Sequence, residues 1–340
     1  MPINELYTKK VDVDNLIPGD IIANDIYLTN GALVIRNGTI LSDRHIEALQ
    51  RMGKRIVTID IRNVYINAVE DSKIIMKKAE DGKNITPEEV KTAISPILRE
   101  VKRERNVSRL LLELQSQDEY TFQHTINIGV ISLSLAKWMG CTDNDELVRI
   151  AMAGTLHDIG KSRIPRPILR KPGKLTPGEF EIMKKHVFFG KKILEKDGTY
   201  GSDLECAILQ HHERIDGTGY PYGLKGDQIH SYAKIVAVAD VYHALTSKRV
   251  YKDKVNPFRV LEHLKKNIDS LDTEIVLTFI DNMLNCLLGC TVELSNGEVG
   301  KVIFTDRDKI SKPLIKLEDR NEVLQLGERK DIAISDILVV

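Results

Sequence analysis

The sequence lacks several features that would assign it at once to a class of protein. No apolar run is long enough to cross a bilayer, and the initial stretch MPINELYTKK lacks the apolar core of a signal peptide. Lysine plus arginine and aspartate plus glutamate both number 49, so the basic excess typical of nucleic acid binding is missing. The four cysteines contain no CxxC pair, which favours buried reduced thiols. We therefore expect a cytoplasmic protein that engages neither a membrane nor a nucleic acid polymer.

The N-terminal part of the chain predicts two small structural units. With 340 residues, 42% of them hydrophobic and 29% charged, the chain can form two or three globular domains. Residues 1–60 combine strand patterns such as KRIVTID with the helix pattern SDRHIEALQRMG, which predicts a small α+β unit. Residues 61–110 are polar and charged, and a capping box from Thr86 to Glu89 opens a helix to about Arg105. This second segment is predicted to be a helical connector.

Residues 111–288 have a helical pattern throughout, whereas residues 289–340 do not. Apolar spacing predicts a series of helices, two of which cover residues 179–196 and 204–214. Predicted N-terminal caps in this region are Asp143 or Asn144, Thr176, Ser202, Asn256 and Asp272. From Gly289 the apolar period becomes two, with a hairpin signal in SNGE. We predict a mainly α protein, with an all-helical domain flanked by a small N-terminal α+β unit and a small C-terminal β domain.

The stretch AGTLHDIGKSRIP places a histidine and an aspartate side by side at the end of a predicted helix. Taken alone, His157 and Asp158 would be an ordinary hydrogen-bonded histidine beside a solvated carboxylate. Other predicted helices, however, carry His124, His186 and the adjacent pair in LQHHER. Asp240 lies within the nearly all-apolar segment YAKIVAVADVYHALT, where an unpaired carboxylate is costly to bury. A bound metal ion removes that cost, and imidazole with carboxylate suits borderline transition metals.

The adjacent pairs favour two metal ions over one. Neighbouring residues on a helix point about 100° apart, so His211 and His212 cannot easily bind one ion from the same turn. Each can reach a different ion of a two-metal cluster. In the same way, His157 can bind one ion while the two oxygens of Asp158 bridge both. The combined set makes a metal centre a better interpretation than unrelated core and surface histidines.

Three ordered motifs resemble those of the HD-GYP domain family. The motifs are HDIGK at 157–161, HHERIDGTGYP at 211–221 and DVYHALTSKRVYK at 240–252, and the resemblance covers about residues 111–285. That family is a branch of the HD superfamily of metal-dependent phosphohydrolases and is associated with hydrolysis of the bacterial messenger cyclic di-GMP. The resemblance implies an all-helical HD-type metallohydrolase domain with two or three divalent metal ions, usually iron or manganese.

Individual roles follow from matching this chain to the family's motifs. One metal ion would take the four ligands His124, His157, Asp158 and Asp240. The second would take His186, His211 and His212, with Asp158 as the bridge. Lys161 matches a lysine near the scissile phosphate, so Lys161 and Asp158 are the candidate catalytic residues. Candidate substrate-binding residues are Lys161, Gly219, Tyr220, Pro221, Arg249 and Lys252.

Two positions depart from the family's pattern. Members with a third metal carry a glutamate one turn before the first histidine, but here Tyr120 has that place and Glu119 is out of helical phase. Two metal ions are therefore expected rather than three. The family commonly has aspartate where this chain has His243, one turn beyond Asp240. His243 is then either a tolerated replacement beside the metal centre or a residue that alters proton transfer or adds a ligand.

The sequence-based hypothesis is a phosphodiesterase that cleaves cyclic di-GMP to linear pGpG, GMP or both. Attack by a hydroxide that bridges two metal ions suits the anionic substrate, because the paired cations stabilise the attacking and leaving oxygens. A weakly catalytic receptor for cyclic dinucleotides and a hydrolase of another cyclic dinucleotide remain as alternatives. The terminal units could support a homodimer or bind a signalling protein, and the sequence does not choose between these roles.

Overall fold

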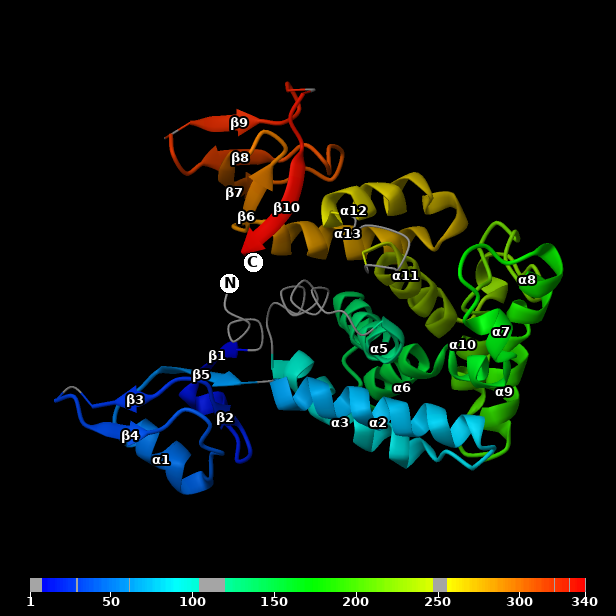
Figure 1. The fold of residues 1–340 in the computed structure, drawn as a ribbon, viewed down its shortest axis with the longest axis horizontal. Coiled ribbons are helices and arrows are strands. Elements are labelled where there is room, and N and C mark those ends of the chain that lie inside the picture. Colours follow the sequence, from blue (N-terminus) through cyan, green and yellow to red (C-terminus); the bar gives the residue numbers. More distant parts are fainter. Residues whose placement is uncertain are drawn as a thin grey trace. The chain divides into compact units, whose positions relative to one another are not determined.

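A computed structural model describes residues 8–28, 30–60, 62–103, 120–246, 256–320, 322–329 and 331–339. The chain divides into two compact units, Met1–Val69 and Glu70–Val340. The mainly helical fold with small sheets at both ends of the chain confirms the predicted fold class (Figure 1). No helix in the described ranges combines the length and the apolar composition needed to span a membrane.

The first unit combines one helix with short strands, as predicted. Its three-stranded sheet has the order β1-β5-β2, and β3 pairs with β4. The bounds are β1 (Thr8–Asp12), β2 (Ile21–Ile22), β3 (Ile26–Tyr27), β4 (Leu33–Ile35), α1 (Asp43–Arg51) and β5 (Ile56–Asp60). Ser42 caps α1, whose buried side chains are Ile46 and Leu49. Strand β1 was not anticipated, because TKKVD carries little apolar alternation outside its pairing with β5.

The second unit begins within α2 and is built around a buried pair of helices, α5 and α6. Helix bounds are α2 (Arg62–Glu80), α3 (Pro87–Arg103), α5 (Tyr120–Trp138), α6 (Asn144–Leu156), α7 (Arg166–Leu169), α8 (Pro177–Lys184), α9 (His186–Glu195), α10 (Ser202–Gln210), α11 (Ser231–Thr246), α12 (Pro257–Lys266) and α13 (Thr273–Leu287). Residues 125–136 of α5 are buried throughout. The two helices touch closely because a Cβ on Gly154 would lie 2.7 Å from the carbonyl oxygen of Ile128.

Most predicted helix starts are correct, and their caps explain why. Asp143, Thr176, Asn256 and Asp272 each accept a hydrogen bond from a backbone N–H in the first turn of the following helix. The predicted cap at Ser202 is wrong, because Gly201 is the capping residue and has no side chain to accept a bond.

Two predicted helices end earlier than their apolar pattern suggested. The predicted helix over 179–196 breaks at Lys185, so that His186 is the first residue of α9. The predicted helix over 204–214 ends at Gln210, so His211 and His212 follow the helix instead of lying within it. Periodicity alone did not show these breaks because the apolar residues continue in phase across them.

A five-stranded antiparallel sheet follows α13. Its order is β10-β6-β7-β8-β9, with β6 (Thr291–Leu294), β7 (Val299–Phe304), β8 (Leu314–Leu317), β9 (Val323–Gln325) and β10 (Ile334–Val339). The predicted β6–β7 hairpin is present, and Gly297 supplies the positive φ that such turns require, here +83°. Alternate residues such as Val292 and Ile315 are buried, which accounts for the change of apolar period.

Candidate metal centre

The ends of several helices bring the predicted ligands together at one buried place. One group consists of Asp158, His186, His211 and His212, and the other of His124, His157 and Asp240. Within each group the potential ligand atoms lie within 4.8 Å of one another. All seven residues that the sequence analysis proposed as ligands therefore meet, although they come from α5, α9, α11 and the turns after α6 and α10.

Asp158 joins the two groups through its two carboxylate oxygens. Its Oδ1 atom lies 3.4 Å from Nε2 of His186. Its Oδ2 atom lies 3.2 Å from Nε2 of His157 and 3.8 Å from Nε2 of His124. Within the second group, Oδ1 of Asp240 lies 3.4 Å from Nε2 of His124. This arrangement is the one expected of a carboxylate that bridges two cations.

Backbone carbonyl groups orient three of the histidines. The Nδ1 atoms of His157, His186 and His211 lie 2.7, 2.8 and 2.8 Å from the carbonyl oxygen three residues earlier in each case. These carbonyls lie at helix ends, where the last turn leaves acceptors unused. Because a carbonyl only accepts, each neutral imidazole carries its proton on Nδ1 and directs the lone pair of Nε2 into the centre.

Burial keeps most of these imidazoles in the neutral form that binds metal ions. Desolvation lowers the pKa of His212 to about 3, and it also holds the pKa of His211 well below its usual range. Burial alone would raise the pKa of Asp158, but the nearby His157 and Lys161 outweigh it and hold the pKa well below its usual range. The centre therefore combines neutral His211 and His212 with an ionised Asp158.

The site contains buried acceptor atoms that a bound cation would satisfy. Nε2 of His157 and Oδ1 of Asp158 are buried and have no hydrogen-bond partner among the described residues. With their protons on Nδ1, His157 and His186 present lone pairs to an oxygen that also carries lone pairs, which is unfavourable in a buried site. Burial lowers the pKa of His157, yet the charges of Asp158 and Asp240 more than reverse this effect. The local field therefore favours a cation, and divalent metal ions would satisfy all of these acceptors.

Lys161 lies one turn after Asp158, on the short 3-10 helix η2 (Ile159–Arg163). Its ammonium group donates to Oδ2 of Asp158 at 2.5 Å, and about a third of its side chain is exposed. Gly160 brings η2 against α9, because a Cβ there would lie 1.9 Å from the carbonyl oxygen of His186. The HD motif thus positions a partly exposed cation beside the centre.

The segment that contains Gly219, Tyr220 and Pro221 covers the centre beside His212. The ring of Tyr220 stacks on the imidazole of His212 with centroids 4.7 Å apart, and its backbone N–H donates to the carbonyl oxygen of His212. Gly219 must lack a side chain, because a Cβ would lie 2.5 Å from the same carbonyl oxygen. Desolvation raises the pKa of the Tyr220 phenol, which favours a packing role over acid catalysis.

Glu213 is a residue of this site that the sequence analysis did not identify. Its buried carboxylate accepts hydrogen bonds from the backbone N–H groups of Tyr222 at 2.7 Å and Leu224 at 3.0 Å. It thereby ties the loop that follows Pro221 to the end of α10. The sequence shows a glutamate directly after the histidine pair, but a glutamate in that position is equally compatible with a solvent-exposed charge. The predicted substrate contacts Arg249 and Lys252, and also Glu119, lie outside the described residues.

His243 contacts His124 through Nδ1, whereas Nε2 of His124 faces Asp240. The Nδ1 atom of His243 is 2.9 Å from Nδ1 of His124, and its Nε2 atom is 3.0 Å from the side-chain amide of Asn127. His243 and Asn127 are both buried. The contact with His124 connects His243 directly to a proposed metal ligand. Asn127 was not identified from the sequence, because it reads there as an ordinary polar residue one turn after His124.

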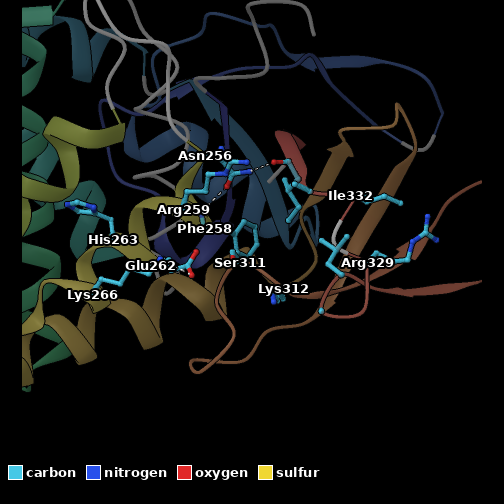
Figure 2. A pocket seen from close by; sticks show the side chains of 14 residues that line it. Asn256, Phe258, Arg259, Glu262, His263, Lys266, Ser311, Lys312, Arg329 and Ile332 are labelled. Carbon is cyan, nitrogen blue, oxygen red and sulfur yellow. Dashed lines mark hydrogen bonds and ion pairs between the residues drawn. The ribbon is translucent and has the colours of Figure 1, made fainter.

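A cavity that the sequence analysis did not predict lies between α12 and the C-terminal sheet. It encloses about 620 Å³, and Figure 2 shows side chains of α12, such as Arg259, on one side and Ile332 and Arg329 on the other. Asn256 donates from its side-chain amide to the carbonyl oxygen of Ile334 at 3.1 Å, across its edge. None of the predicted site residues lines this cavity.

The fold and the centre define a class of protein, namely helical domains built around a histidine–aspartate metal site. A model of the HD domain family matches residues 107–275 of the chain. This part of the chain is therefore an HD domain, which confirms the resemblance inferred from the HDIGK and HHERIDGTGYP motifs.

Curated relatives agree with this assignment. A protein of Pseudomonas aeruginosa named a cyclic di-GMP phosphodiesterase is 34% identical over 244 residues, which are 72% of this chain and 58% of the relative. A cyclic di-GMP phosphodiesterase of Thermotoga maritima is 39% identical over 215 residues, or 63% of this chain and 54% of the relative. A Vibrio cholerae protein named 3'3'-cGAMP-specific phosphodiesterase 2 is 38% identical over 168 residues, or 49% of this chain and 32% of the relative. The chain spans little more than half the length of the first two relatives.

One solved structure supports the fold. An HDG"Y"P protein from Bdellovibrio bacteriovorus aligns with a TM-score of 0.53, over 81% of this chain and 98% of that protein. The sequences are 16% identical, so this likeness bears on the fold alone.

Proposed function

We propose that this protein is a metal-dependent phosphodiesterase that hydrolyses cyclic di-GMP to linear pGpG, GMP or both. The observation that carries the proposal is the position of Asp158, which directs one oxygen toward each of two groups of histidines. A centre of this form suits an anionic phosphodiester, whose negative charge increases toward the transition state. The curated relatives named as cyclic di-GMP phosphodiesterases give the substrate class its support.

The proposed cofactors are two divalent ions, iron or manganese. The residues proposed to hold them are His124, His157 and Asp240 for one ion, His186, His211 and His212 for the other, and Asp158 for both. Imidazole with carboxylate oxygen suits these borderline metals, and seven ligands exceed what one ion can use. When bound, the ions would supply positive charge that activates water and stabilises charge on the phosphate.

The protein's own side chains would position the substrate. Lys161 carries the partly exposed ammonium group nearest to Asp158, so we assign it to a phosphate oxygen of the substrate. Tyr220 holds the loop of Gly219 and Pro221 against His212, where this loop can contact the rest of the cyclic dinucleotide. Arg249 and Lys252 remain proposed phosphate contacts on the basis of the motif alone.

The direct test is turnover by the metal-loaded protein. We would purify the full chain without oxygen, measure its iron and manganese content, and separate the products of cyclic di-GMP by chromatography. About two ions per chain and release of pGpG or GMP are expected. Metal-loaded protein that leaves cyclic di-GMP intact would refute the assigned activity, while one ion or none per chain would refute the two-metal centre.

A second candidate substrate is 3'3'-cGAMP. The relative named for that substrate is 38% identical to this chain over 49% of the chain's length. The two relatives named for cyclic di-GMP are 34% and 39% identical to it. Both substrates carry the same phosphodiester backbone and differ in one base. Parallel assays with the two cyclic dinucleotides at equal concentration would separate these candidates.

Several predictions from the sequence are retained as part of this proposal. The boundaries 111–288 for the catalytic domain and 289–340 for the β domain lie within the second compact unit. A cytoplasmic location also stays a prediction, as does a role of the terminal units in homodimer formation or in binding a signalling protein.

A further inference from the structure

His124 differs from the other oriented histidines in what its Nδ1 atom meets. His157, His186 and His211 meet backbone carbonyl oxygens, which can only accept a hydrogen bond. His124 meets Nδ1 of His243 at 2.9 Å, and an imidazole nitrogen can either donate or accept. The tautomer of His124 therefore depends on the tautomer of His243.

Asn127 in turn determines the tautomer of His243. The amide nitrogen of Asn127 lies 3.0 Å from Nε2 of His243, and an amide nitrogen only donates. In that orientation a neutral His243 accepts at Nε2 and carries its proton on Nδ1, which donates to Nδ1 of His124. A neutral His124 then carries its proton on Nε2, at 3.4 Å from Oδ1 of Asp240. This set of protons leaves no lone pair on His124 Nε2 for a metal ion.

The opposite set of protons makes His124 a ligand. If the amide of Asn127 turns by 180°, its oxygen accepts from Nε2 of His243, and Nδ1 of His243 can then accept from Nδ1 of His124. The proton on His243 Nδ1 moves to His124 Nδ1, the proton on His124 Nε2 leaves to solvent, and His243 Nε2 takes one from solvent. The number of protons on the three side chains stays the same, and the lone pair of His124 Nε2 faces Asp240 and Asp158.

We propose that Asn127 and His243 are positioning residues that set the tautomer of His124 and so control whether it can bind a metal ion. The helices make this relay compact, because Asn127 follows His124 by one turn of α5 and His243 follows Asp240 by one turn of α11. Both contacts are direct, and the one between Asn127 and His243 is buried while the one between His243 and His124 is partly buried. This inference rests on the metal centre of the proposed function, but not on its substrate.

The test compares two substitutions of Asn127 in the full chain. Asn127→Leu removes the acceptor that the metal-binding arrangement requires. Asn127→Asp keeps the size and supplies oxygens that only accept, so it holds the proton on Nε2 of His243. Manganese affinity would be measured by competition with a chelator, with circular dichroism and thermal unfolding of the metal-free proteins as a check on folding.

We expect Asn127→Leu to weaken binding of one of the two Mn²⁺ ions by about 10- to 100-fold, the usual effect of removing a partner that orients a ligand. Asn127→Asp is expected to bind both ions at least as tightly as the unaltered protein. His263→Leu, an exposed histidine of α12, serves as the control and should change nothing. In nitrogen-15 spectra of the histidine rings, Asn127→Asp should also protonate His124 at Nδ1 before metal is added.

Three results would overturn the relay. The first is a folded Asn127→Leu variant that binds both ions with unaltered affinity. The second is an Asn127→Asp variant as weak as Asn127→Leu, which would mean that only the packing of the amide matters. The third is an unaltered protein that binds no Mn²⁺, which would remove the centre as well. Two bound ions without hydrolysis of a cyclic dinucleotide would refute the proposed activity and leave the relay standing.

Discussion

A Cβ atom on Gly160 would lie 1.9 Å from the carbonyl oxygen of His186. This contact joins the HD motif to the start of α9 and brings ligands of the two groups together. We predict that Gly160→Ala forces the two backbones apart. The free energy of unfolding should fall by about 1–3 kcal/mol. The substitution should also lower metal content. Gly178→Ala is the matched control, since a Cβ there meets nothing within 4 Å. Equal unfolding temperatures and metal contents for the two variants would contradict the prediction.

Asp158→Asn should lose metal and activity together. An amide has one oxygen acceptor and no negative charge, so it cannot bridge two cations as a carboxylate does. Elemental analysis and a turnover assay with cyclic di-GMP check this expectation. A variant that keeps both ions and normal turnover would show that Asp158 is not the bridge.

Lys161→Ala should keep the metal ions and lower turnover by about 10²-fold or more, the usual loss when one charged partner of the transition state is removed. Lys174→Ala tests the same change of charge at an exposed loop position and should retain full turnover. Comparison of kcat for the two variants, with metal content measured in parallel, decides the matter. If Lys161→Ala behaves like the control, the lysine belongs to the solvated loop.

His243→Asp should raise turnover of cyclic di-GMP with metal content unchanged. A carboxylate can only accept from Nδ1 of His124, so it would hold His124 in the metal-binding tautomer without the help of Asn127. Steady-state kinetics and elemental analysis of the variant test this. A sharp fall in turnover together with loss of a metal ion would mean that His243 supports the centre in a way that a carboxylate cannot replace.

Deletion of residues 289–340 should leave a folded domain that still binds metal, because every proposed ligand precedes this segment. The truncated chain should nevertheless unfold at a lower temperature. It would lose the bond from Asn256 to Ile334 and the ion pairs of Lys265 with Asp308 and of Asp281 with Arg307. Metal content and thermal unfolding of the truncated protein provide the test. Insoluble or metal-free protein would show that the β sheet is needed to complete the helical core.

The sequence predicted the fold class well because its local signals agree with the tertiary structure. Thr176 and Asp272 accept the capping bonds expected of them, and the change of apolar period after α13 marks a real sheet. Two errors of helix length lie where apolar periodicity continues across a break, at Lys185 and after Gln210. A break of this kind depends on contacts with other helices, such as the approach of Gly160 to His186, which no local pattern records.

The sequence by itself determined which side chains could form the centre, because a histidine pair, a His-Asp pair and an aspartate in an apolar helix are costly to bury unless they share a cation. Only the tertiary structure decided how these side chains face one another. The oxygens of Asp158 point in two directions, and carbonyl groups at helix ends select the tautomers of His157 and His211. It also placed Asn127 next to His243, although 116 positions separate them in the chain. A hydrogen bond forms through distance and direction in space, and those depend on how whole helices pack.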